Sequence, residues 1–275
     1  MFLDAATRER EYSPSSVIGG NYTPFLERYR VESAVARKML SVQRDLRYGT
    51  SPRALIDFFP APPTAAQPGL LVYLHGGYWQ ELSKDDSAFL APAWHAAGLA
   101  HAVIGYTLAS AATLPAIVDE CRAALAWLHA RAATLGFDPA NVVLAGSSAG
   151  GYLAAACADA SPVPIRGIVP ISGVYDVSPL IGTSINDALG LDATTAAALD
   201  LLRGTRRFRP AVVACGAIET SEFRRQSRAF ASRLAADGVP CTSLEVPGRN
   251  HFDVVFDLAD PSTLLFAAAR ALFDR

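Results

Sequence analysis

A serine flanked by glycines follows an apolar run near the middle of the chain. Residues 146–150 read Gly-Ser-Ser-Ala-Gly, directly after the apolar residues 141–145 and before the Ala-rich residues 152–158. The apolar run is typical of a buried strand, and the Ala-rich run favours a helix. Between them, Ser148 would stand on a sharp turn that pushes its hydroxyl out of the sheet, and glycines there leave room for the neighbouring backbone. We therefore expect Ser148 to be a nucleophile in an α/β fold.

The pentapeptide alone occurs by chance in roughly one chain in ten of this length, so the rest of the sequence has to support it. A serine that attacks an acyl group needs a base, an acid that orients the base, and N–H donors for the oxyanion. In this fold the order along the chain is Ser, then Asp or Glu, then His. Of the five histidines only His251 follows Ser148, in the Gly/Pro/Asn loop 247–252 after a strand-like run at 242–246. We expect His251 to be the base, against the alternative of a surface loop histidine.

The acid is left between two glutamates. Residues 211–215 predict a buried strand, and Glu219 and Glu222 lie in the segment that follows it. Glu219 is nearer the strand end, where a carboxylate could reach the His251 ring and fix its tautomer. Glu222 is expected at the start of the helix 223–236, where an acidic residue favours the helix dipole. We favour Glu219 and keep Glu222 as the alternative.

An upstream motif offers the oxyanion donors. The strand-like residues 70–74 lead into His-Gly-Gly-Tyr-Trp at 75–79. Consecutive glycines let the backbone turn its N–H groups inward, so Gly76 and Gly77 would act together with the N–H of Ala149, the residue after the nucleophile. His75 itself is expected to be a structural hydrogen-bonding residue rather than a base.

The composition fits one α/β domain over residues 1–275. The chain is 51% hydrophobic and 18% charged, which is enough for one large core, and its formal charge of −2 gives no argument for nucleic acid or an anionic membrane as a partner. The first residues lack a signal-peptide core, and no uninterrupted apolar stretch reaches about 18 residues, so the cytoplasm is the expected location. The four cysteines have no metal-ligand spacing and are interpreted as buried, reduced thiols. We expect no metal and no cofactor.

The apolar runs alternate with helical stretches, which predicts a mostly parallel sheet. One long helix is expected at 115–135, and an apolar helix at 261–273 is expected to end the chain. Between 174 and about 205 no strand is indicated, and this insertion is interpreted as a small cap over the site. The strands are expected at 55–59, 70–74, 102–106, 142–145, 166–171, 211–215 and 242–246.

The 75–79 motif, with Tyr and Trp where many related esterases carry a third glycine, resembles that of the kynurenine formamidase (arylformamidase) branch of the α/β-hydrolases. The likeness covers most of the chain. The resemblance implies an α/β-hydrolase fold with helices on both faces of the sheet, and cofactor-free hydrolysis of N-formylkynurenine through a triad at Ser148, Glu219 and His251. The family more often has Asp where this chain has Glu219. Further matching segments lie at 12–15, 48–49, 172–176, 222–227 and 251–253.

The aromatic residues Tyr78 and Trp79 beside the oxyanion motif would suit an aryl ring better than a flexible acyl chain. With Tyr175 and Phe252 from the matching segments, they are our candidate substrate-binding residues, while packing of Trp79 under a helix is the alternative. The expected partner is a small aryl amide or ester, and a homodimer is left open. The other functions considered are a small-acyl or aryl carboxylesterase, an amidase on another acylated arylamine, and a non-catalytic binding protein. The last is disfavoured because the serine and the histidine are both present.

Overall fold

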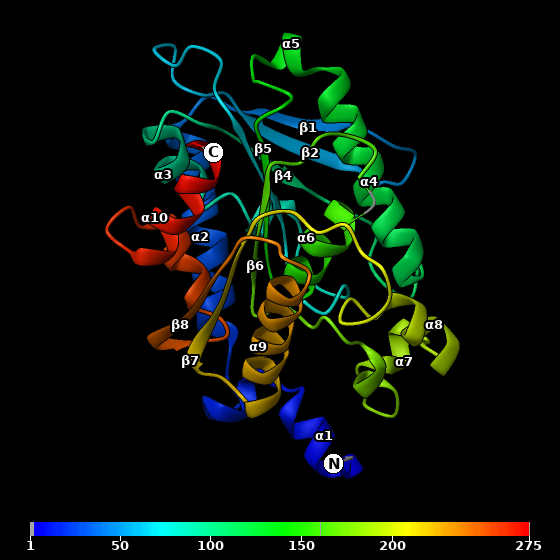
Figure 1. Cartoon of the computed structure of the whole chain (residues 1–275). Helices are drawn as coiled ribbons and strands as arrows, with labels where there is room; N and C mark the ends of the chain where they lie inside the picture. Colours follow the sequence, from blue (N-terminus) through cyan, green and yellow to red (C-terminus); the bar gives the residue numbers. More distant parts are fainter. Residues whose placement is uncertain (1–2, 160, 275) are drawn as a thin grey trace.

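The computed structural model describes residues 3–159 and 161–274, and one eight-stranded sheet runs through them (Figure 1). Its spatial order is β1-β2-β4-β3-β5-β6-β7-β8. The β1/β2 and β2/β4 pairs are antiparallel, and all the others are parallel. The strands are β1 (Gln43–Arg47), β2 (Leu55–Phe59), β3 (Leu70–Leu74), β4 (Ala100–Ile104), β5 (Val142–Ser147), β6 (Gly167–Ile171), β7 (Ala211–Ile218) and β8 (Cys241–Asn250).

Helices cover both faces of this sheet (Figure 1). Successive side chains of β3 point to opposite sides: Leu70, Val72 and Leu74 belong to one hydrophobic core, and Leu71 and Tyr73 to the other. The first core is closed by α4 (Leu114–Ala130), α6 (Ala149–Asp159) and α9 (Ser221–Ala236), and the second by α2 (Thr23–Met39), α3 (Ala91–Ala96) and α10 (Leu264–Arg270). This doubly covered sheet is the expected α/β-hydrolase architecture.

Short elements gather at the end of the sheet where the parallel strands finish. They include α1 (Ala5–Glu11) and the 3-10 turn Pro14–Val17 from the amino-terminal part. The expected cap region contributes Ser178–Leu180, α7 (Asn186–Leu189) and α8 (Ala193–Leu199), all of them short. Contacts between these two groups, such as the Arg8 guanidinium donating to the Ile181 carbonyl at 2.6 Å, hold them side by side.

Several expected boundaries are corrected. The long helix is two helices, because the backbone leaves helical geometry at Arg131 before α5 (Ala132–Leu135). The C-terminal helix is confined to Leu264–Arg270, followed by a 3-10 turn at Ala271–Asp274. β4 lies two residues earlier than expected, β7 and β8 run further, and β1 was not anticipated because its sequence, Gln-Arg-Asp-Leu-Arg, has no apolar run.

Among the described residues, no helix combines the length and apolarity that crossing a bilayer would need. All four cysteines are free thiols. Cys121, Cys157 and Cys215 are buried as expected, whereas Cys241 is partly exposed.

Candidate active site

The turn after β5 holds Ser148 in a left-handed backbone conformation, with φ of 57°. Its N–H donates to the Ile171 carbonyl at 2.8 Å, which ties the turn to the neighbouring strand. The flanking glycines are required by space: a Cβ on Gly146 would lie 2.1 Å from the Gly150 carbonyl oxygen, and one on Gly150 would lie 1.9 Å from that of Leu74. The serine is therefore fixed at the junction of β5 and α6, as the motif predicts.

The ends of β7 and β8 bring the acid and the base together. Ile218 and Asn250 are register partners, so the residues that follow them, Glu219 and His251, emerge side by side. The Glu219 Oε2 atom lies 3.0 Å from His251 Nδ1, and both side chains are buried. A carboxylate in this position fixes the tautomer that carries its proton on Nδ1 and leaves Nε2 free as a base.

The other oxygen of Glu219 is also fully engaged. Oε1 accepts from the Ser172 hydroxyl at 2.6 Å and from the Gly216 N–H at 2.5 Å. Ser172 directly follows β6 and, like Ser148, has a positive φ, of 51°. These two donors orient the carboxylate toward the imidazole. Sequence reasoning missed Ser172, although its place at the end of a parallel strand next to β7 was a usable signal.

Glu222 lies in the first turn of α9 and faces other partners. Its carboxylate accepts from Arg225, at 2.9 Å from Nε and 2.8 Å from Nη2, and from the Tyr12 hydroxyl at 2.9 Å. Burial disfavours its charge, but the hydrogen bonds from Arg225 and Tyr12 outweigh burial and lower the pKa of Glu222. Of the two glutamates, only Glu219 contacts His251.

The oxyanion candidates lie across from the serine. A Cβ on Gly76 would be 2.8 Å from the Ser147 carbonyl oxygen and 3.3 Å from Ser148 Cβ, which shows how closely this loop approaches the turn. Gly77 has φ of +91°. Within the part of the chain that the structure describes, the N–H groups of Gly76, Gly77 and Ala149 have no protein acceptor. They are available for a negatively charged oxygen.

His75 is packed as a structural residue. Its ring stacks on Tyr106, with centroids 4.1 Å apart, and its Nδ1 lies 3.0 Å from the Gly76 carbonyl oxygen. Burial lowers the pKa of His75 to about 4, so the ring is neutral at neutral pH.

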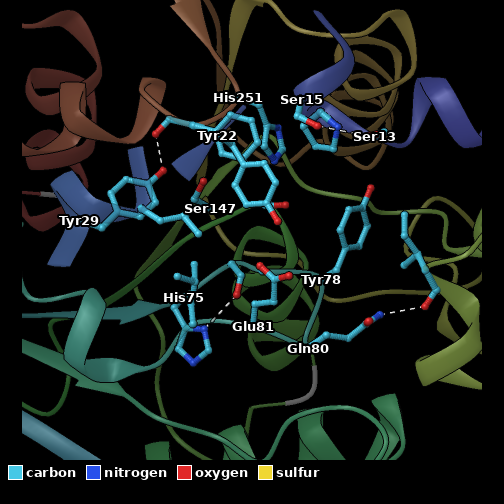
Figure 2. Close-up of a pocket in the computed structure, with 18 of the residues that line it drawn as sticks. Ser13, Ser15, Tyr22, Tyr29, His75, Tyr78, Gln80, Glu81, Ser147 and His251 are labelled. Atoms are coloured by element: carbon cyan, nitrogen blue, oxygen red, sulfur yellow. Dashed lines mark hydrogen bonds between the residues drawn. The ribbon is translucent and has the colours of Figure 1, made fainter. Parts of the chain in front are cut away.

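A cavity of about 340 Å³ joins these parts (Figure 2). Ser148, His251, Gly76 and Gly77 line it, and so does Ser147. Among the described residues, no hydrogen bond joins the Ser148 hydroxyl to His251, a separation common in free enzymes because such contacts tighten when substrate binds. Seven of the lining residues are Tyr or Phe: Tyr12, Tyr22, Tyr29, Tyr73, Tyr78, Phe89 and Phe252.

The four expected substrate-binding residues divide evenly. Tyr78 and Phe252 line the cavity. Trp79 does not: its side chain is fully buried and packs edge-on against Tyr152, with centroids 5.5 Å apart. Tyr175 is buried too, stacked on Phe230 at 4.1 Å, on the α9 side of the sheet. These two expectations are corrected, because both rings are used in packing the first core.

Comparison with known proteins shows which families and solved structures the chain is similar to. The BD-FAE family model matches residues 56–162. The kynurenine formamidase of Danio rerio is 28% identical over 243 residues, which are 84% of this chain and 81% of the relative. Carboxylesterase/phospholipase LipF of Mycobacterium tuberculosis is 30% identical over 256 residues, 80% of this chain and 65% of the relative. The crystal structure of a candidate thioesterase from Silicibacter sp. TM1040 superposes with a TM-score of 0.84 at 28% identity, covering 96% of this chain and 98% of that chain.

The chain is a kynurenine formamidase-like α/β-hydrolase. The hydrolase also uses residues that sequence reasoning did not connect with its site. Tyr22, the N-cap residue of α2, and Tyr29, in the first half of that helix, line the cavity, and Ser184 and Ile185 reach it from the cap region. No local pattern marks these positions, since they meet the serine only through the packing of segments distant in sequence.

Proposed function

We propose that this hydrolase cleaves an aryl formamide of the N-formylkynurenine kind to an arylamine and formate, through an acyl-enzyme on Ser148. The observation that carries the proposal is the joint placement of Ser148 and the Glu219–His251 pair on one cavity bounded by aromatic rings. The similarity to kynurenine formamidases supports the same substrate class.

In the first half of the reaction, Ser148 Oγ bonds to the formyl carbon while its proton moves to His251 Nε2. The carbonyl oxygen becomes an oxyanion, which the free N–H groups of Gly76, Gly77 and Ala149 would stabilise. Glu219 stabilises the imidazolium that forms and does not itself take up the proton. The C–N bond then breaks, and His251 donates the acquired proton to the departing nitrogen.

In the second half, a water molecule attacks the formyl ester. Its proton moves to His251 Nε2 as the new C–O bond forms, and the bond between the formyl carbon and Ser148 Oγ then breaks. The proton returns to Ser148, and formate leaves. An arylamine is expelled more readily than an alkylamine, so a serine, histidine and glutamate arrangement suited to esters is sufficient for an aryl formamide.

A small-acyl or aryl carboxylesterase is the second candidate, because the same residues serve esters and because a mycobacterial carboxylesterase is among the relatives. An amidase acting on a different acylated arylamine uses the same chemistry again. A cavity of about 340 Å³ lies at the lower end of the range for small-molecule sites, which favours a short acyl group in all three cases.

The deciding experiment compares kcat/KM on N-formylkynurenine, on p-nitrophenyl acetate and on a panel of acyl anilides, with Ser148→Ala as the blank. The proposal expects the aryl formamide to be the best substrate. A preference for p-nitrophenyl acetate would indicate a carboxylesterase, and a preference for another anilide would indicate an amidase of different acyl specificity.

A further inference from the structure

The ionised groups around the cavity are unbalanced. Glu9 and Glu81 both line it, and among the described residues that line it none is Lys or Arg. Arg53 is close by, where its guanidinium donates to the Leu82 carbonyl at 3.1 Å, but it does not line the cavity. A substrate that enters therefore meets negative charge without a matching positive group.

The carboxylates of Glu9 and Glu81 differ in their hydrogen bonding. Both oxygens of Glu9 are engaged by Ser184, one by its N–H at 2.9 Å and the other by its hydroxyl. The Glu81 side chain is exposed at the cavity, and within the described chain its carboxylate makes neither an ion pair nor a hydrogen bond. Glu81 is thus the acidic group that remains free to bind a ligand.

The backbone of Glu81 is fixed to the oxyanion loop. Its N–H donates to the Gly77 carbonyl at 2.9 Å, and a Cβ on Gly77 would lie only 2.6 Å from the Glu81 carbonyl oxygen. The intervening Tyr78 and Trp79 both have positive φ, at 48° and 60°. This tight turn fixes the position of the Glu81 backbone relative to Gly76 and Gly77. A group bound by Glu81 would therefore lie at a defined distance from a carbonyl held at these glycines.

Aromatic rings complete the surroundings of this carboxylate. In Figure 2 the Glu81 side chain extends into the cavity on the side of Tyr22. The negative charge of Glu81 raises the pKa of the Tyr22 hydroxyl, as expected for neighbouring groups. Tyr22 in turn stacks on Phe252, with centroids 5.3 Å apart and planes 7° apart. A free carboxylate beside aromatic faces is the combination that binds an organic ammonium group.

We propose that Glu81 selects substrates whose aryl leaving group carries a positively charged amine, such as the amino-acid ammonium of N-formylkynurenine, and that the cavity disfavours a carboxylate that has no ammonium beside it. The proposal rests on the hydrolase function proposed above and narrows its substrate class. An ammonium-bearing aryl formamide would satisfy Glu81, whereas a carboxylate without an ammonium would lie near two acidic side chains, and none of the described residues that line the cavity is Lys or Arg. Glu81 is here a specificity residue and takes no part in bond making or breaking.

The test uses ortho-formamidophenyl ketones that share one scaffold and end in an ammonium, a propyl or a carboxylate group. We expect kcat/KM for the ammonium compound to exceed that for the neutral compound by about fivefold, and the carboxylate compound to be the poorest. Glu81→Gln should bring the ammonium-to-neutral ratio to about one, and Glu81→Arg should make the carboxylate compound better than the ammonium compound. Raising the salt concentration should lower the ratio, because the contact is partly exposed.

Glu9→Gln is the matched control, since it removes the same charge from the same cavity at a carboxylate already engaged by Ser184. It should keep more than half of the ammonium preference. The same three end groups placed on para-substituted phenyl acetates measure the charge preference on esters, so it can be read even if formamides are not the substrate. The proposal is overturned if the parent enzyme does not prefer the ammonium compound in either series. It is equally overturned if Glu81→Gln leaves the ratio unchanged.

Discussion

The strand edge that carries the proposed reacting groups and the loop that follows β3 are built differently. At the strand edge, both carboxylate oxygens of Glu219 are hydrogen bonded and His251 is buried beside them. In the oxyanion loop after β3, by contrast, Glu81 is exposed, and among the described residues its carboxylate has no hydrogen-bond or ion-pair partner. A saturated, buried array keeps its geometry through the reaction, whereas an exposed group can adapt to a ligand. The comparison favours bond chemistry for the buried strand edge and selectivity for the exposed Glu81 carboxylate.

The largest effect should come from the nucleophile. Ser148→Ala removes the proposed nucleophile, so kcat should fall by about 10⁴- to 10⁶-fold on any substrate, and labelling by a fluorophosphonate probe should disappear. Ser147→Ala is the control, because this neighbour is the last residue of β5 and also lines the cavity. If Ser148→Ala is still labelled, the strand edge does not carry the chemistry as described.

Next in size is the separation of the two glutamates. Glu219→Gln should lower kcat by about 10⁴-fold, because an amide supports the wrong imidazole tautomer. Glu222→Gln keeps the His251 environment and breaks only contacts with Arg225 and Tyr12, so its kcat should fall less than tenfold. Steady-state kinetics on an activated ester measure both. A reversed ranking would make Glu222 the acid and contradict the geometry.

Acid should lower the free energy of unfolding, because two histidines are buried in their neutral form. Burial lowers the pKa of His75 to about 4 and that of His101 to about 3, below the usual value of about 6.5. The unfolded chain therefore binds more protons than the folded one between pH 6.5 and 4. The free energy of unfolding should fall with decreasing pH there, by about 1.4 kcal/mol per unit for each histidine.

Urea unfolding at several pH values measures that slope. His101 lies on β4 and does not line the cavity, so His101→Leu should reduce the slope by the share of one histidine. An unchanged slope in this variant would show that His101 is not the group that takes up the proton.

The smallest effect concerns the aromatic wall. Phe252→Leu removes a ring that lines the cavity, and the preference for aryl over short alkyl esters should fall by about three- to tenfold. Trp79→Phe alters a ring in the first core and should leave that ratio unchanged while lowering stability. Ratios of kcat/KM together with unfolding midpoints distinguish the two. A changed ratio in Trp79→Phe would return that residue to the substrate site.

The sequence was most informative where chemistry and backbone geometry coincide locally. The predicted bounds of β2 and β3 agree with the structure, because β3 is one apolar run and β2 is apolar except for Asp57, and the turn at Ser148 was predicted because glycine is needed on both sides of it. The preference for Glu219 also agrees with the contact at His251. Glu219 was preferred because it is near the end of a strand, and this too is a local property of the sequence.

The rest depends on packing between distant segments. β1 is polar because it is an exposed edge strand, so it lacks the pattern of the buried ones. Trp79 and Tyr175 are aromatic, as are several residues that line the cavity, and only the three-dimensional arrangement shows that these two face the core. Tyr22 and Glu81 both line the cavity, one from the start of α2 and the other from the oxyanion loop, and no spacing rule connects these segments. A cytoplasmic location and a homodimer stay predictions.

The contacts of Tyr12 have a consequence for the order of folding. Its hydroxyl bonds to Glu222, 210 residues further along the chain, and its carbonyl accepts from the Tyr78 hydroxyl at 2.5 Å. Bringing such distant residues together costs conformational entropy, which slows the step. The contacts of Tyr12 can offset that cost only after the sheet between them has formed. The cavity wall is then among the last parts to assemble, and hydrolytic activity should return later in refolding than the signal of the central strands.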